Sequence, residues 1–237
     1  MQFTRGREGI GLVIGLTSLF FAFAPYGVFY IAVLILTLFL SYELCKTLSI
    51  REFYLFPALF CIMSLWLEIG LLAIFLTSFY IGWKYWNMAQ FLKAFLIGFY
   101  SSLLPVYLLA LKKYEPYAVV KLLLFVWSMD VLSYYVGKTY GKHALAPRLS
   151  PQKTWEGLLG GYAGGTLILV LLHGYRGLIF SLPMVFFALM GDLFKSFIKR
   201  QLGIKDFSNI LGEHGGFVDR FDSTLFTAPI YLFLLKL

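Results

Sequence analysis

Long runs of apolar residues, separated by short polar stretches, extend over almost the whole 237-residue chain. Hydrocarbon offers the backbone no hydrogen-bond partners, so such runs are expected to form helices, and crossing a membrane takes about 20 residues. The strict apolar–polar alternation of a membrane barrel does not occur. The runs predict about nine transmembrane helices, at roughly residues 9–24, 27–42, 52–67, 69–83, 91–111, 117–136, 157–173, 177–194 and 223–237.

The boundaries of these runs are soft, and residues 52–83 could instead form one long span and a re-entrant segment. No internal repeat or linker divides the chain. We therefore predict an all-α, polytopic integral membrane protein built as a single membrane domain, with N-terminal spans in 1–120 and a catalytic half in 121–237. The composition agrees: 60% of the residues are hydrophobic and 14% are charged, against about 25% charged in a soluble domain.

The net charge of +8 is distributed unevenly between the two sides that nine spans would create. Fifteen of the 20 Lys and Arg residues fall on one side and five on the other. Because cytoplasmic loops of membrane proteins collect Lys and Arg, the richer side is predicted to be cytoplasmic. This predicts a multi-pass protein of the inner (cytoplasmic) membrane, with a polar cavity and active site open to the cytoplasm. It also explains the positive charge without a nucleic-acid partner.

Most of the acidic chemistry lies between Gly191 and Asp222, which contains four of the five aspartates. If the helix continues beyond Asp192, then Asp192, Ser196, Lys199 and Arg200 share one helical face. Asp219 and Asp222 are three residues apart at the entry to the last span, so two helix ends could bring carboxylates to a common point. Carboxylates and phosphates are ligands of Mg²⁺, and Lys and Arg neutralise phosphate oxygens.

Two further polar features precede this stretch. Asp130 lies inside an apolar run, at a cost of about 3 kcal/mol on insertion scales, so it should face a partner or a wet cavity. An ion pair between two helices is the alternative. Farther along the chain, Pro151 is surrounded by Ser150, Lys153 and Thr154. Their hydroxyls and ammonium could bind a phosphate, although an ordinary helix start also explains them. The Gly160-Gly161 and Gly164-Gly165 pairs predict close helix packing.

The run Ser196-Phe-Ile-Lys199-Arg200, then Lys205-Asp206-Phe-Ser208, then Leu211-Gly-Glu-His214-Gly215-Gly216-Phe-Val-Asp219-Arg220-Phe-Asp222 resembles the signature of the phosphatidate cytidylyltransferases, or CDP-diacylglycerol synthases. Asp130, Gly137 and the stretch from Ser150 to Gly157 resemble that family's upstream motif. The resemblance covers roughly residues 125–235. It implies transfer of CMP from CTP to phosphatidic acid, giving CDP-diacylglycerol and pyrophosphate in phospholipid synthesis. It also implies Mg²⁺ or another divalent cation, room for a second cation, a lipid bilayer and a homodimer.

The resemblance implies that Asp192, Asp219 and Asp222 are metal ligands, that Lys199, Arg200, Lys205 and Arg220 meet phosphates, and that Ser150, Lys153 and Thr154 help to close the cavity. The candidate catalytic residues are Asp192, Lys199, Arg200, Lys205, Asp206, His214 and Arg220. The candidate substrate-binding residues are Asp130, Ser150, Lys153, Thr154, Ser196, Gly215 and Gly216. His214 could be a general base, a phosphate ligand or a loop histidine held by a hydrogen bond.

One departure from the family pattern bears on the metal. Lys195 stands where the family commonly carries Glu, so a base replaces an acid beside the predicted ligands; this could weaken cation binding or add a phosphate contact. A lipid-alcohol kinase or another prenyl- or lipid-nucleotidyltransferase would use similar parts. A transporter or channel with intramembrane carboxylates is an alternative of a different class. A transporter predicts acids near the midplane and often paired halves. Here the acids gather at one side and the halves are dissimilar.

Overall fold

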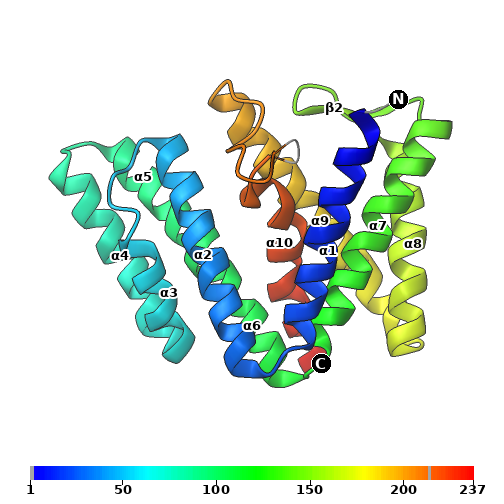
Figure 1. Ribbon diagram of the computed structural model, residues 1–237, viewed down its shortest axis with the longest axis horizontal. Coiled ribbons are helices and arrows are strands. Elements are labelled where there is room, and N and C mark those ends of the chain that lie inside the picture. Colours follow the sequence, from blue (N-terminus) through cyan, green and yellow to red (C-terminus); the bar gives the residue numbers. More distant parts are fainter. Residues whose placement is uncertain (1–2, 213–214) are drawn as a thin grey trace. The chain divides into compact units, whose positions relative to one another are not determined.

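The computed structural model describes residues 3–212 and 215–237, and about 80% of the chain is helical (Figure 1). The helices are α1 (Phe3–Phe23), α2 (Tyr26–Leu48), α3 (Leu55–Leu65), α4 (Leu67–Lys84), α5 (Met88–Ile97), η1 (Gly98–Leu103), α6 (Leu104–Tyr114), α7 (Ala118–Tyr140), α8 (Trp155–His173), α9 (Arg176–Gln201) and α10 (Phe217–Lys236). Two short strands, β1 (Ala144–Ala146) and β2 (Ser150–Thr154), lie between α7 and α8.

The chain divides into two compact units. The first consists of Met1–Pro116 together with Asp206–Arg220, and the second of Tyr117–Lys205 together with Phe221–Leu237. The break after Pro116 lies close to the predicted boundary between the N-terminal spans and the catalytic half. Residues 206–220, however, group with the N-terminal spans. The first turn of α10 therefore belongs to the first unit, and the rest of that helix belongs to the second.

In the described part of the chain, six helices are long and apolar enough to cross a membrane. They are α2, α4, the continuous helix Met88–Tyr114, α7, α8 and α9. The apolar part of α1 (Gly11–Phe23) and α3 are shorter. At 1.5 Å per residue, α3 is about 16 Å long, which is half the thickness of the hydrocarbon layer. The helices support a multi-pass membrane protein, and the predicted count of nine spans is not confirmed.

The third of these helices, Met88–Tyr114, contains a π-helical turn at Gly98–Leu103. Pro105 follows directly, and proline cannot donate the usual helical hydrogen bond and crowds the preceding turn. Widening the helix to a π-turn is a known way to absorb such a defect. Hydroxyls fill the buried space: Ser41 Oγ donates to Ser101 Oγ at 3.0 Å, and Ser102 Oγ donates to the Phe56 carbonyl at 2.8 Å.

The second unit is organised by the packing of α7 against α8. A Cβ built on Gly161 would lie 2.0 Å from Ser133 Oγ, and one on Gly164 would lie 2.4 Å from the Leu132 side chain. Only a missing side chain allows the two backbones to come this close, and stripes of small residues at such spacing are typical of membrane helix pairs. The predicted role of these glycines in helix packing is confirmed.

The prediction of an all-α protein misses one element, the β1–β2 hairpin. The strands pair antiparallel, with Ala144 opposite Thr154 and Ala146 opposite Ser150. This segment is too short and polar to continue either flanking helix, so its backbone groups find partners by pairing with each other. The hairpin matters because β2 carries Ser150, Lys153 and Thr154, three of the predicted substrate-binding residues.

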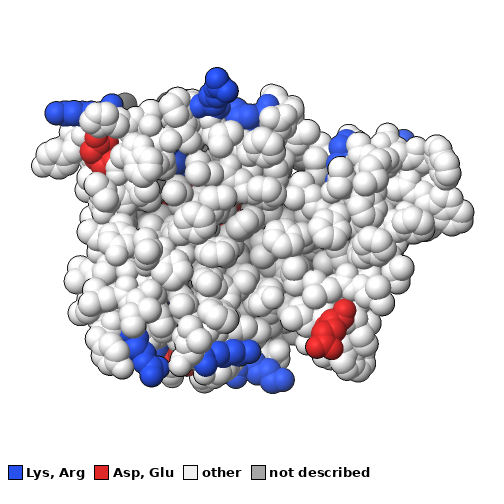
Figure 2. All heavy atoms as spheres, turned by 180° about the vertical axis from the view of Figure 1, so that it is seen from behind, with Lys and Arg blue, Asp and Glu red and all other residues white. Residues whose placement is uncertain are grey.

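Charged side chains are confined to the borders of the surface shown in Figure 2. On that face, Lys, Arg, Asp and Glu gather toward the upper and lower edges, and the area between them is almost wholly uncharged. Many large apolar side chains are exposed at helix positions, among them Phe20, Leu72, Leu171 and Leu182. Exposed apolar surface of this extent is expected where helices meet lipid.

Candidate active site

A cavity of about 680 Å³ lies in the second unit. Its polar lining comes from four elements: Asp130, Ser133, Tyr134 and Lys138 of α7, Ser150, Gln152, Lys153 and Thr154 of β2, Asp192 of α9, and Ser223 of α10. Five of these ten are sequence-predicted site residues: Asp130, Ser150, Lys153, Thr154 and Asp192. The cavity is large enough for a nucleotide-sized ligand, because typical ligand pockets occupy about 300–1,000 Å³.

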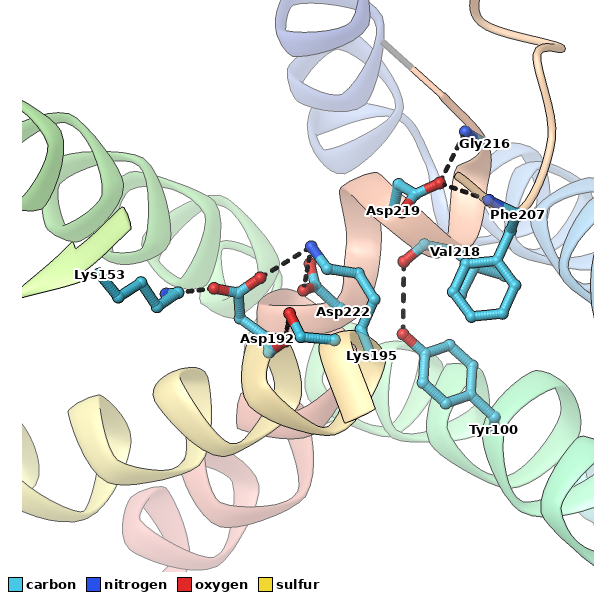
Figure 3. A network of polar contacts seen from close by, with 10 residues as sticks. Tyr100, Lys153, Asp192, Lys195, Phe207, Gly216, Val218, Asp219 and Asp222 are labelled. Carbon is cyan, nitrogen blue, oxygen red and sulfur yellow. Dashed lines mark hydrogen bonds and ion pairs between the residues drawn. The ribbon is translucent and has the colours of Figure 1, made fainter. Parts of the chain in front are cut away.

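The most charged part of this unit is a chain of ion pairs beside the cavity (Figure 3). Lys153 pairs with Asp192, and the ammonium of Lys195 lies 2.8 Å from Asp192 Oδ1 and 2.7 Å from Asp222 Oδ2. The side chains of Lys195 and Asp222 are 14% and 7% exposed. Charges removed from water to this degree are costly unless paired. Two lysines and two aspartates balance each other, and Lys195 bridges both carboxylates.

Asp130 adds a negative charge to the cavity wall. It has an exposed side chain and lines the cavity. Among the ion pairs of the described residues, none involves Asp130, so the alternative of a helix-tying ion pair is not what the structure shows. Lys138 of α7 also lines the cavity, so the three aspartates and three lysines of this region balance in formal charge: Asp130, Asp192, Asp222, Lys138, Lys153 and Lys195.

Backbone and side-chain hydrogen bonds fix the hairpin that carries Lys153. Thr154 caps α8 by accepting from Gly157 N at 3.1 Å. The Glu156 carboxylate accepts from the backbone N–H groups of Lys142 and His143 at 3.1 and 3.3 Å. Arg200, predicted to meet phosphate, donates from Nε to the Leu149 carbonyl in the hairpin turn at 3.2 Å. These contacts hold β2 at the edge of the cavity.

In the first unit, Asp219 lies in the first turn of α10, three positions after Gly216. Its Oδ2 accepts from Gly216 N and from Phe207 N, each at 3.1 Å. The bond to Gly216 is the acidic half of a capping box, in which the third helical residue satisfies the N–H that precedes the helix. Gly215 has φ +77°, and a Cβ there would lie 2.8 Å from Asp219 Oδ2. Glycine is therefore required for the loop to approach Asp219.

Glu43 of α2 is a functional candidate that the sequence analysis missed. It is fully buried and binds the same loop: Oε1 accepts from Ser208 Oγ at 2.6 Å and Phe217 N at 3.0 Å, and Oε2 accepts from Val218 N at 3.0 Å. The signal was present, because Glu43 is an acid at the end of a long apolar run, where an ionisable residue indicates function by default.

The predicted site residues thus fall into two groups. Asp130, Ser150, Lys153, Thr154, Asp192, Ser196, Lys199, Arg200, Lys205 and Asp222 belong to the second unit, and Asp206, Gly215, Gly216, Asp219 and Arg220 belong to the first. Ser196 Oγ donates to the Asp192 carbonyl at 2.8 Å, which ties it to its own helix. Lys205 and Asp206 are exposed. His214 lies outside the described residues.

Comparison with known proteins identifies the family that has this sequence. Residues 4–237 match the cytidylyltransferase family over nearly the whole chain. The chain belongs to the cytidylyltransferase family. A phosphatidate cytidylyltransferase of Aquifex aeolicus is 39% identical over 99% of this chain and 92% of the relative. The predicted resemblance is confirmed.

Two other members of the family match a shorter region. The phosphatidate cytidylyltransferase of Pseudomonas aeruginosa is 41% identical over 49% of this chain and 46% of its own length. That of Bacillus subtilis is 42% identical over 47% of this chain and 45% of its own length. The chain therefore aligns with about half the length of each of these two relatives.

Two carboxylates of the second unit, Asp192 and Asp222, fit a divalent cation. Asp192 and Asp222 offer the hard oxygen ligands that Mg²⁺ prefers, and both direct an oxygen at one positive group, the Lys195 ammonium. The point between them is therefore built to hold positive charge. No group of three or more Asp, Glu, His or Cys side chains is close enough to hold a metal within the described residues. The donors fit a cation that brings its remaining ligands from the substrate.

Proposed function

We propose that this chain transfers CMP from CTP to phosphatidic acid, producing CDP-diacylglycerol and pyrophosphate. An oxygen of the lipid phosphate attacks the α-phosphorus of CTP. The bond from that phosphorus to the oxygen bridging to the β-phosphate breaks, and pyrophosphate leaves with the electron pair. The observation that carries the proposal is the chain Lys153–Asp192–Lys195–Asp222 beside a cavity of nucleotide size.

The lipid phosphate is already a nucleophile, so the reaction needs positioning and charge stabilisation rather than a general base. Lys153 sits on the cavity wall, where its ammonium can exchange part of its pairing with Asp192 for a phosphate oxygen. The hydroxyls of Ser150 and Thr154 lie on the same strand. These groups would orient the polyphosphate and stabilise the charge that develops on the leaving pyrophosphate.

We also propose that the reaction uses Mg²⁺, held by Asp192, Asp219 and Asp222 together with substrate phosphates, with room for a second cation. When bound, the metal would neutralise phosphate charge and stabilise the leaving group. The support is the chemistry of the donors: two carboxylates that already share one cationic partner, Lys195. On this proposal Lys195 either keeps that position or yields it to the metal and contacts phosphate.

The setting of the reaction is proposed to be the inner membrane, with the cavity open to the cytoplasm so that CTP enters from water and the lipid from the bilayer. The uneven distribution of Lys and Arg supports this orientation. The resemblance to phosphatidate cytidylyltransferases supports a homodimer. Cysteine labelling of loop residues in intact and permeabilised cells tests the orientation, and light scattering in detergent tests the dimer.

The reaction is tested with purified protein in detergent, phosphatidic acid, Mg²⁺ and CTP labelled at either the α- or the γ-phosphate. Cytidylyl transfer moves the α-label into the chloroform phase and leaves the γ-label in aqueous pyrophosphate. A lipid-alcohol kinase would give the reverse pattern when a lipid alcohol replaces phosphatidic acid. Asp192→Asn should lower the transfer rate on the order of 100-fold or more, and Glu68→Gln, a change at an exposed acid on α4, should leave it unchanged. If neither label enters the lipid with folded wild-type protein, the proposal is wrong.

A further inference from the structure

Glu43 lies 174 residues before the helix whose N–H groups it binds. Its carboxylate accepts one hydroxyl and two consecutive backbone N–H groups, those of Phe217 and Val218, at 2.6 to 3.0 Å. These N–H groups belong to the first turn of α10, where a helix has no internal partners for its donors. The positive end of the helix dipole and the donors together stabilise a buried carboxylate at this place.

Two carboxylates divide the first turn of α10 between them. Asp219 accepts from Gly216 N, and Glu43 accepts from the next two, Phe217 N and Val218 N. Gly216 leaves the space that this arrangement needs, because a Cβ there would lie 2.5 Å from Glu43 Oε2. The orientation of Asp219 is thus fixed by the same turn that Glu43 holds.

The contact is part of a stripe along α2. Phe39, Glu43 and Thr47 are four residues apart and share one helical face. The ring of Phe39 stacks on Phe217 with centroids 4.5 Å apart and planes at 10°. Thr47 Oγ1 donates to the Phe207 carbonyl at 3.4 Å. One face of α2 therefore contacts both ends of the segment from 207 to 217.

We propose that Glu43 is a positioning residue for the reaction. Its carboxylate holds Ser208 and the first turn of α10, and through that turn it holds Asp219 in its working orientation. Glu43 itself does not touch substrate. This inference rests on the proposed function, in which Asp219 is a metal ligand, and it assigns a catalytic consequence to a residue of the N-terminal half.

The test compares Glu43→Gln with wild type and with Glu68→Gln, the same change at an exposed position. Glutamine keeps the size of the side chain but replaces one accepting oxygen with a donor, so either Phe217 N–H or Val218 N–H loses its partner. The expected result per folded molecule is a kcat about 10- to 100-fold lower and a several-fold higher half-saturating Mg²⁺ concentration. The KM for phosphatidic acid should change less than kcat.

Hydrogen exchange supplies a readout that does not depend on activity. Amides in the peptide 206–220 should exchange faster in Glu43→Gln than in wild type, with helices α7 and α8 unchanged. If wild type shows no transfer activity, the proposed function fails, and exchange alone still decides whether Glu43 holds the segment. Wild-type kcat and wild-type exchange in the variant would overturn the inference, as would lower thermal stability with unchanged kcat per folded molecule.

Glu43→Gln could fail to fold, because its side chain is fully buried. The same measurements are then made on Ser208→Ala, which leaves both backbone bonds to Glu43 in place. It removes the hydrogen bond to Glu43 Oε1 and the local one that Ile210 N donates to Ser208 Oγ at 3.3 Å. A roughly threefold lower kcat with faster exchange in the peptide 206–220 supports the inference. Wild-type values for both quantities contradict it.

Discussion

Two pairs of carboxylates, one pair in each unit, are satisfied in different ways. In the first unit, Glu43 and Asp219 accept hydrogen bonds from backbone N–H groups and a serine hydroxyl. In the second unit, Asp192 and Asp222 pair with the ammonium groups of Lys153 and Lys195 (Figure 3). Backbone donors cannot leave without unfolding the turn, whereas a lysine side chain can rotate away. The first arrangement fixes a geometry, and the second can exchange one cation for another.

The largest effect on activity is expected from a substitution in the ion-paired group of the second unit. Asp192→Asn removes the carboxylate that both lysines share, so their ammonium groups lose a counter-charge and any metal loses a ligand. We expect kcat to fall on the order of 100- to 1,000-fold, as when a group that stabilises transition-state charge is removed. Steady-state kinetics on folded protein measure this. A loss below tenfold would mean that Asp192 is not part of the reacting site.

Lys195→Met tests whether a divalent cation can take the place of the Lys195 ammonium between Asp192 and Asp222. Without the ammonium, Asp192 keeps its pairing with Lys153, but the buried carboxylate of Asp222 loses the Lys195 ammonium, and breaking a buried pair in this way costs about 3–5 kcal/mol. If the two carboxylates can hold a divalent cation, Mg²⁺ should raise the thermal midpoint of the variant more than that of wild type. Thermal unfolding in detergent with and without Mg²⁺ measures this. Equal shifts in both proteins would argue against a metal at that point.

Gly216→Ala tests the arrangement in which Glu43 binds the first turn of α10. The added methyl would lie 2.5 Å from Glu43 Oε2, and relieving the overlap must move either the carboxylate or the first turn of α10. Overpacking of this kind costs about 1–3 kcal/mol. Gly27→Ala is the matched control on α2, because a Cβ there meets nothing within 4 Å. Denaturation midpoints and kcat should fall only for Gly216→Ala, and similar behaviour of both variants would remove the steric argument.

The smallest effect, a change in stability, is expected from substitution of Glu52, which lies between α2 and α3. Burial acts to raise the pKa of this carboxyl, but donation from Lys84 and Tyr85 outweighs it, so the pKa in the folded protein lies below the ordinary 4.5. A depressed pKa stabilises the fold above about pH 4.5, and that contribution is lost as the pH falls through the folded value.

Glu52→Gln should therefore be less stable than wild type at neutral pH, and the difference should shrink below pH 4.5. Lys84 is 44% exposed, so solvent screening keeps the neutral-pH difference below about 1 kcal/mol. Unfolding free energies of the two proteins at pH 7, 5 and 4 measure it. A difference that does not change with pH would show that packing, not charge, accounts for the effect.

Much of the fold and site followed from local patterns. The apolar runs located the long helices because helix formation in hydrocarbon depends on neighbouring residues alone. The paired glycines from Gly160 to Gly165 indicated close helix packing, and the structure shows that the partner helix is α7. The short apolar stretches were harder, because a run of 11 residues such as α3 has the composition of a span without its length.

Apolar runs, composition and the motif from Ser196 to Asp222 are properties of neighbouring residues, so they are enough to identify a helical membrane protein of the cytidylyltransferase family. Folding was needed to show which groups meet: Lys153 of the hairpin and Asp192, the Lys195 ammonium between two aspartates, and Glu43 at the first turn of α10. Residues separated by as many as 175 positions have no spacing rule that relates them, and only packing makes them neighbours.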